Sequence, residues 1–175
     1  NNNISGPPSD GLYLNNLYDF GYNIKNNAMV DIGNFEFSGN WMTSTGTGIY
    51  FSSLSNFGVF LYDNSSYFNG DWIIKDNTVW SEFQALYFEP YQFGYNMYGN
   101  SKATYGTNEI IGNYLNSTDS EGLYAYWWYQ FAYEIYDNSS VTAGDCLIVN
   151  NNVSAHGSTQ ALETGPYETA YYVYD

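Results

Sequence analysis

Hydrophobic and polar residues alternate along much of the chain in short runs. Examples are the stretches NFEFSGNWM, TGIYFSSL, FGVFLYD, DWIIKDN, TVWSEFQALYFEP, QFGYNMYG, NEIIGNYLN and DCLIVNNNV. Because successive side chains of a strand point to opposite faces, this period of two predicts β-strands. Asn, Gly, Asp and Ser, which favour turns, separate the runs, and no stretch has the three-turn amphipathic pattern of a helix. The pattern predicts an all-β protein.

The runs recur about every ten residues, a spacing that is typical of sandwiches and barrels. We expect an antiparallel two-sheet β-sandwich of the jelly-roll or concanavalin-like kind. The first eleven residues are polar, and Gly6, Pro7 and Pro8 favour an extended path. The expected organisation is therefore an extended N-terminal arm (1–11) followed by a single domain (12–175), whose length suits one core.

The most aromatic stretch is residues 124–137, YAYWWYQFAYEIYD. Read as one strand, it has a core face made of Ala125, Trp127, Tyr129, Phe131, Tyr133 and Ile135. The opposite face carries Tyr124, Tyr126 and Trp128, whose phenol and indole groups can meet water, a sugar, a peptide or another subunit. The alternative is a central strand with both faces packed. We expect the second face to be covered by a partner or a glycan, because a bare aromatic patch promotes aggregation.

Charge restricts the choice of partners. Lys and Arg total 3 against 18 Asp and Glu, the formal net charge is -15 at pH 7, and no Arg occurs. This balance opposes binding to nucleic acid, whose phosphates require Lys and Arg, and to anionic membranes. No apolar run reaches the about 18 residues that a membrane-spanning helix needs. The low charged fraction, and a chain that begins at Asn1 rather than Met, are typical of a processed, secreted protein.

Five sequons, in which Asn is followed by any residue and then Ser or Thr, are candidate N-glycosylation sites. They begin at Asn3, Asn64, Asn116, Asn138 and Asn152. Asn64, Asn116 and Asn138 lie in polar stretches that we expect to connect strands and to be exposed. Glycans at these positions would solubilise an aromatic surface that has little charge, so covalent N-glycans are expected partners.

Few residues have the chemistry of a catalytic or metal site. The chain holds 1 Cys and 1 His, so it lacks a zinc or iron ligand set, and we expect no metal site and no cofactor. Calcium stays open, because acidic and Asn-rich turns such as DNTVWSE and STDSE supply oxygens. Cys146 lies in the apolar stretch GDCLIV and is expected to be a buried structural residue rather than a reactive thiol. His156, in the polar stretch SAHGS, is expected on the surface. This scarcity of candidate groups favours a function other than catalysis.

Two stretches resemble the glutamic peptidases (eqolisins). YAYWWYQFAYEIYDNSSVTAGDCLIV is similar to that family's aromatic strand and the Gly-Asp strand that follows it, and WSEFQALYF is similar to the strand that carries its catalytic glutamine. The resemblance implies a secreted, acid-active double-sheet sandwich. It also implies that Gln84, on its strand, would act with Glu163 or Glu168 to activate water against a peptide bond.

The combined features favour a secreted, N-glycosylated structural protein of the cell surface, of an archaeal type. It would assemble with copies of itself into an extracellular filament or layer. Donor-strand exchange, in which the N-terminal arm completes the sheet of the next copy, is one route to such an assembly. The alternatives are an acid-active glutamic-type peptidase and a carbohydrate-binding module whose exposed Trp and Tyr rings stack on sugars.

Overall fold

The computed structural model describes residues 3–5, 11–15, 21–54, 57–90, 93–127, 131–157 and 160–166. Within these ranges the chain forms short strands that build five sheets, here called A to E in the order in which the chain enters them. The chain passes through all five sheets and then returns to the first. Each such circuit is one coil of the fold.

The strands are distributed over the sheets in a fixed order. Sheet A contains β1 (Asn3–Ser5), β6 (Trp41–Ser44), β11 (Thr78–Ser81), β16 (Tyr114–Ser117) and β21 (Asn152–Ala155). Sheet B contains β2 (Leu12–Asn15), β7 (Ile49–Leu54), β12 (Leu86–Pro90), β17 (Leu123–Trp127) and β22 (Leu162–Pro166). Sheet C contains β3 (Tyr22–Ile24), β8 (Phe57–Leu61), β13 (Phe93–Met97) and β18 (Phe131–Ile135). Sheet D contains β4 (Met29–Asp31), β9 (Ser66–Asn69), β14 (Lys102–Tyr105) and β19 (Ser140–Ala143), and sheet E contains β5 (Phe35–Ser38), β10 (Trp72–Lys75), β15 (Asn108–Ile111) and β20 (Cys146–Val149).

Strand pairing joins each coil to the next. Trp41 lies opposite Thr78, which lies opposite Tyr114 in the following coil. Equivalent residues of neighbouring coils are 36 to 38 residues apart in the sequence. Every pairing among the described strands is parallel. The architecture is therefore a parallel β-solenoid of about four turns.

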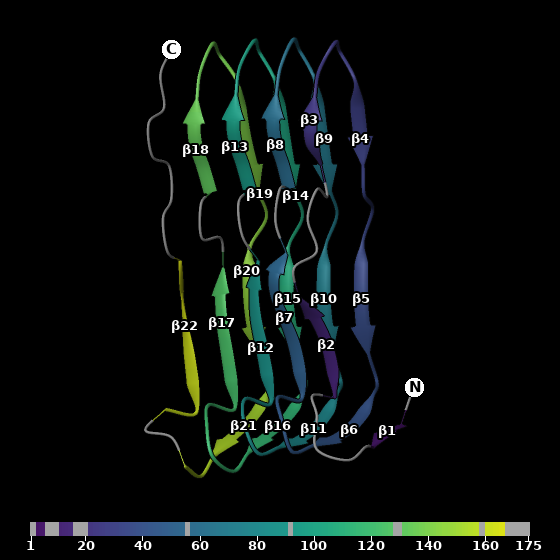
Figure 1. Ribbon diagram of the computed structural model, residues 1–175, viewed down its shortest axis with the longest axis vertical. Coiled ribbons are helices and arrows are strands. Elements are labelled where there is room, and N and C mark those ends of the chain that lie inside the picture. Colours follow the sequence, from purple (N-terminus) through teal and green to yellow (C-terminus); the bar gives the residue numbers. More distant parts are fainter. Residues whose placement is uncertain are drawn as a thin grey trace.

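Each coil is flattened into two layers (Figure 1). Sheets B and C follow each other along the long axis of the molecule, and the chain then turns back through sheets D and E. Sheet A closes the coil at the opposite end. The coils stack side by side, so that a given position of the repeat forms a row that runs along the stacking axis.

The space between the layers is filled by rows of apolar side chains. Ile49, Leu86 and Leu123 occupy one position in successive strands of sheet B, and all three are fully buried. Phe57 of sheet C packs edge-on against Trp72 of sheet E, with ring centroids 5.7 Å apart. Such contacts between opposite layers bury apolar surface that a single coil could not cover.

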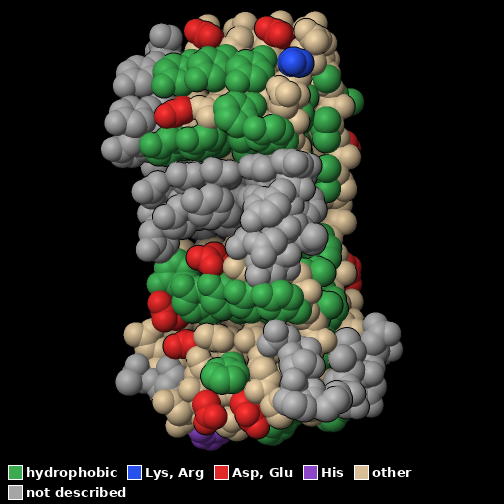
Figure 2. Space-filling model, in the orientation of Figure 1, with side chains coloured by type: hydrophobic (Ala, Val, Ile, Leu, Met, Phe, Trp, Pro, Cys, Tyr) green, Lys and Arg blue, Asp and Glu red, His purple; other side chains and the backbone are tan. Residues whose placement is uncertain are grey.

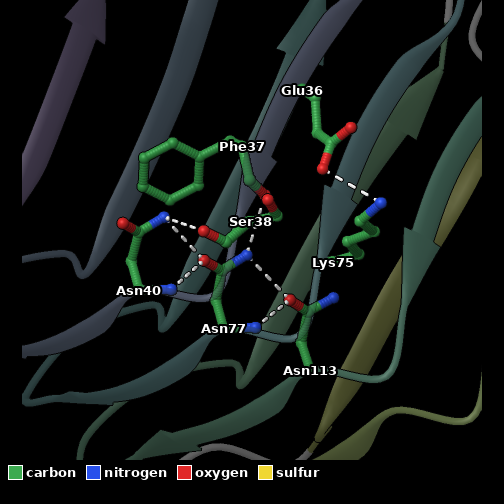
Figure 3. Close-up of polar contacts among 7 residues, drawn as sticks. All are labelled: Glu36, Phe37, Ser38, Asn40, Lys75, Asn77 and Asn113. Atoms are coloured by element: carbon green, nitrogen blue, oxygen red, sulfur yellow. Dashed lines mark hydrogen bonds and ion pairs between the residues drawn. The ribbon is translucent and has the colours of Figure 1, made fainter. Parts of the chain in front are cut away.

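A buried row of asparagines joins the coils where sheet E leads into sheet A (Figure 3). The backbone N–H and the side-chain amide of Asn40 both donate to Oδ1 of Asn77, at 3.0 Å each. Asn77 binds Asn113 in the same way, at 3.0 Å, and Asn113 binds Asn151, at 2.9 Å. The side chain of Asn77 also donates to the Phe37 carbonyl. This set of four residues, here called the asparagine ladder, satisfies buried amides only when the coils are in register.

The expected antiparallel two-sheet sandwich is wrong. The chain is all-β, but its strands are parallel and coiled rather than joined as antiparallel hairpins. Local alternation is the same in both architectures, because it reports only which face of a strand is buried. The segment assigned to an N-terminal arm contributes Asn3–Ser5, which pair with β6 of their own chain.

Two predicted strands also differ from the observed ones. Residues 124–137 are not one strand, because β17 ends at Trp127 and β18 begins at Phe131, in a different sheet. Of the expected core face, Ala125 and Ile135 are buried and Tyr133 is half-buried, while Tyr129 lies outside the described residues. Gln84 does not lie on a strand either, because residues 82–85 bend the chain between β11 and β12.

Candidate interaction surface

A row of tyrosines crosses the outer face of sheet B. Tyr13, Tyr50, Tyr87 and Tyr124 occupy the same position in four successive coils. Their rings stack with centroids 4.7, 4.7 and 4.5 Å apart, and the interplanar angles are 3°, 22° and 6°. The spacing is that of neighbouring strands in a sheet, so the backbone itself sets the stacking distance. We call these four residues the sheet B row.

A second row lies where sheet C turns into sheet D. Tyr62, Tyr98 and Tyr136 stack with centroids 5.4 and 4.9 Å apart and nearly parallel rings. In sheet C itself, Tyr95 and Tyr133 stack at 5.0 Å. Figure 2 shows the result as bands of hydrophobic side chains that run across this face along the stacking axis. We call the surface formed by these rows and the sheet B row the tyrosine face.

Carboxylates lie among the tyrosines. The Tyr87 hydroxyl donates to Oε2 of Glu89 at 2.5 Å, and the Tyr126 hydroxyl donates to Oε1 of Glu163 at 2.7 Å. Phenols hold these acids by charge-assisted hydrogen bonds, and no cation is involved in either bond. The tyrosine face is therefore aromatic and acidic at once.

Burial disfavours the ionisation of four phenols of this face. Desolvation raises the pKa of Tyr62, Tyr95 and Tyr98, and the nearby Glu134 carboxylate raises the pKa of the last two further. Burial, followed by the hydrogen bond to Glu89, also raises the pKa of Tyr87. Phenolate is thus disfavoured at these four residues, which present neutral hydroxyls.

The residues predicted as an interface are partly on this face. Tyr124 belongs to the sheet B row, and the ring of Tyr126 lies 4.8 Å from it on the same strand. Trp128 lies outside the described residues. Tyr13, Tyr50 and Tyr87 were not predicted, although the four tyrosines recur at intervals of 37 residues, the distance between coils. This 37-residue interval in the sequence is the signal that identifies the row.

The residues implied by the peptidase resemblance have other partners in the structure. Oε1 of Gln84 accepts from the Thr47 hydroxyl at 3.3 Å, and Nε2 of Gln84 donates to Glu121 at 3.1 Å. Both bonds connect neighbouring coils at the corner between sheets A and B. Glu163 lies on β22 and binds Tyr126, while Glu168 lies outside the described residues. The described contacts of Gln84 and Glu163 are accounted for by coil stacking.

The sequons fall in three kinds of place. Asn64 and Asn138 are exposed in equivalent turns between sheets C and D. Asn152 is exposed on β21 of sheet A, and Asn3 is the first residue of β1. Asn116 lies within β16 rather than in a turn, and only 7% of it is exposed. The folded structure leaves room for a glycan at Asn64, Asn138 and Asn152.

The single thiol and the imidazole lie apart from the tyrosine face. Cys146 is half-buried on β20 and packs against the core, and desolvation raises its pKa to about 11. His156 is exposed in the bend that follows β21. The expectation of a structural cysteine and a surface histidine agrees with these positions.

Three further observations bear on function. Among the described residues, no group of three or more His, Cys, Asp or Glu side chains is placed to hold a metal ion. The described part of the chain also contains no helix with the length and apolar character needed to cross a membrane. Comparison with protein-family models, curated proteins and solved structures found no match.

Proposed function

We propose that this protein is a secreted structural protein that assembles through its tyrosine face with copies of itself into an extracellular filament or layer. The observation that carries the proposal is the alignment of tyrosine rows along the stacking axis (Figure 2). Rings that stack within a row cover one another's faces, so the row presents edges and hydroxyls outward. A second copy has rows of the same spacing and can interdigitate with them.

The geometry of a repeated face favours self-association over binding to an unrelated protein. Identical faces present matching rows to one another. When the copies are offset along the rows, each face contacts two others, and this contact does not close, so it propagates into a filament. Tyr is also enriched in interface cores, because its ring is large and its hydroxyl tolerates partial hydration. Sheets B and C follow each other in one layer of the coil (Figure 1), so the stacked Tyr50 and Tyr87 of sheet B and the stacked Tyr95 and Tyr133 of sheet C together enlarge the possible contact.

Charge is the main opposing factor. Each copy has a formal net charge of -15, and Glu89, Glu134 and Glu163 belong to the sheets of this face. Repulsion between copies falls as the carboxylates become protonated, and the pI of the sequence is about 4.1. Assembly should therefore strengthen as the pH falls from neutral towards about 4.

Secretion is supported by the surface chemistry. The chain has only 3 Lys and Arg, and exposed sequons at Asn64 and Asn138 border the tyrosine face rather than occupy its centre. Glycans there would keep the turns solvated without covering the sheet B row. Intact mass of the native material, compared with the 19.9 kDa of the chain, measures whether glycans are attached.

Donor-strand exchange is a separate route of assembly that the N-terminal segment could provide. Asn3–Ser5 pair with β6 in the same chain, so exchange would require β1 to leave β6 and pair with another copy. Deleting residues 1–10 separates the two routes. Assembly through the tyrosine face survives this deletion, whereas assembly by exchange is lost.

The decisive experiment is electron microscopy of the native protein at neutral and acidic pH, with a face variant beside it. We expect ordered filaments or layers, more abundant in acid, and their loss in the double variant Tyr50→Ser and Tyr87→Ser. The matched control is Phe68→Ser, which removes an aromatic ring that is 40% exposed on sheet D. Dispersed particles at both pH values, or equal losses in the face variant and the control, would refute the proposal.

A further inference from the structure

Sheet A differs from the other sheets in its lack of charge. Its five strands have the sequences NIS, WMTS, TVWS, YLNS and NVSA, without a single Asp, Glu, Lys, Arg or His. Each of the other four sheets has at least one charged residue in its strands. In a chain of net charge -15, this sheet offers a neutral surface of aromatic, hydroxyl and amide groups.

The outward positions of sheet A carry two exposed indoles. The second residue of β6, β11 and β16 points inward, as the complete burial of Met42, Val79 and Leu115 shows. The first and third residues therefore point outward. Trp41 occupies a first position and Trp80 a third position, and each is 42% exposed.

A threonine lies next to each indole and leaves the ring face on that side accessible. The register places Trp41 beside Thr78, and Trp80 between Thr43 and the buried Asn116. This arrangement is the opposite of the sheet B row, in which each ring is covered by the next tyrosine. Trp80 also approaches Tyr114 at 5.4 Å, with the rings tilted by 39°, so the aromatic residues alternate between first and third positions along three coils.

We propose that the outer face of sheet A binds a neutral oligosaccharide. The apolar faces of the sugar rings would stack on Trp41 and Trp80, and the hydroxyls of Thr43 and Thr78 would exchange hydrogen bonds with sugar hydroxyls. This site is separate from the tyrosine face and does not depend on self-assembly.

The size of the surface favours a small ligand over a second protein. Five strands of three or four residues cover at most about 13 Å by about 24 Å, which is on the order of 300 Å². A stable protein interface buries about 800 Å² on each partner. A neutral face likewise lacks the carboxylates that would attract a cationic partner. An oligosaccharide of a few units fits both the area and the chemistry.

The test is a calorimetric titration of the full chain with a panel of neutral oligosaccharides, chosen from a glycan array. We expect at least one to bind, with an affinity that changes little with salt concentration, because no ion pairs form. Trp41→Ala and Trp80→Ala should each weaken binding by about tenfold or more. Trp80→Phe should retain part of the affinity, because it keeps an aromatic face.

The matched control is Phe68→Ala on sheet D, which should bind as the wild type does. Circular dichroism of each variant verifies that the coils remain folded. A blank array overturns the proposal, and so does unchanged affinity in folded Trp41→Ala and Trp80→Ala. Sedimentation that shows self-association lost in Trp80→Ala, without sugar binding in the wild type, would assign this face to a second copy and also overturn it.

Discussion

Asparagine acts in this molecule as a connector between coils. Its side-chain amide both donates and accepts hydrogen bonds. Asn77 accepts one from Asn40 of the preceding coil and donates one to Asn113 of the following coil (Figure 3). Asp lacks the donor and Ala lacks both groups. A row that repeats every coil therefore requires a side chain with both functions, and the buried position makes each unmade bond costly.

Replacing Asn77 with Ala should destabilise the protein by about 3 kcal/mol or more, because several buried partners, among them the Phe37 carbonyl, lose their hydrogen bonds. Denaturant unfolding measures the change. Asn152→Ala, at an exposed position, is the control and should change the free energy of unfolding by less than about 0.5 kcal/mol. Equal effects of the two substitutions would mean that the asparagine ladder contributes little.

Burial also determines the chemistry of Cys146. Since its pKa is raised to about 11 by desolvation, little thiolate exists near neutral pH. Alkylation of the native protein at about pH 8 should be on the order of 100-fold slower than that of a free cysteine. The same reaction in denaturant is the control and should be fast. Rapid labelling of the folded chain would show that the thiol is accessible and ionised.

Sheet C has an unusual backbone among the elements of the coil. Gly58, Gly94 and Ala132 occupy equivalent positions in β8, β13 and β18, and all have positive φ, at 66°, 58° and 53°. In this sheet only every second residue of a strand pairs with the next strand, as Tyr95 of β13 does with Tyr133 of β18. A side chain in this region of φ costs roughly 1–2 kcal/mol, so the repeat favours glycine at this position.

Gly94→Ala should therefore lower stability by about 2 kcal/mol or more, since the left-handed backbone is strained and the new Cβ would lie 2.6 Å from Cγ2 of Val141. The comparison is Gly165→Ala in β22, where the nearest side-chain atom, on Tyr126, would be 3.7 Å away. Thermal unfolding of both variants gives the difference. A Gly94→Ala protein as stable as Gly165→Ala would contradict the described geometry of sheet C.

The sequence predicted many strands but not their partners. Alternation placed β5, β10 and β13 within predicted runs, whereas β9, β14 and β19 of sheet D were missed because SYFN, KATY and SVTA are short and largely polar. The partner of each strand lies 36 to 38 residues away, and local alternation holds no information on it. The signal was the recurrence of YDNSS, YGNSK and YDNSS from Tyr62, Tyr98 and Tyr136, which marks successive coils.

The interaction surface was predicted only in part for the same reason. Tyr124 and Tyr126 could be assigned to an outward face because they alternate with Ala125. Tyr13, Tyr50 and Tyr87 join them only through coil stacking, which brings together residues from distant parts of the chain. Trp41 and Trp80 are likewise neighbours only in the folded sheet.

At the scale of the whole molecule, stability is distributed over contacts between neighbouring coils. Each row, whether of Asn, Tyr or Leu, adds a similar contact at every coil interface, as in other repeat folds. Ion pairs contribute little to stability, because the chain has only 3 Lys and Arg. The ion pair of Lys75 with Glu36, at 2.9 Å, is exposed to solvent, which weakens it. Among the side chains that titrate above neutral pH, tyrosine is the most abundant, with 21 residues.

This composition predicts unfolding in alkali. The folded-state pKa is raised, chiefly by burial, for Tyr62, Tyr67, Tyr87, Tyr95, Tyr98 and Tyr105. In the unfolded chain these phenols ionise near about pH 10. Their contribution is fully present below that pH and is lost as the pH rises towards the folded-state values, because the unfolded chain then binds fewer protons. The melting temperature should fall steeply above about pH 10, and phenolate absorbance should rise together with unfolding.

Tyr67 provides the sharpest form of this test. Its hydroxyl is the only described side-chain polar atom that is fully buried without a hydrogen-bond partner, and desolvation alone raises its pKa. Tyr67→Phe removes the group that must ionise and fills the same volume, so stability at neutral pH should be unchanged or higher by about 1 kcal/mol. The fall in melting temperature above about pH 10 should be shallower than in the wild type, because one fewer raised phenol titrates on unfolding. Phe68→Ser, at an exposed ring that carries no phenol, should leave the alkaline profile as it is, and a similar shift in both variants would show that the Tyr67 phenol does not control the transition.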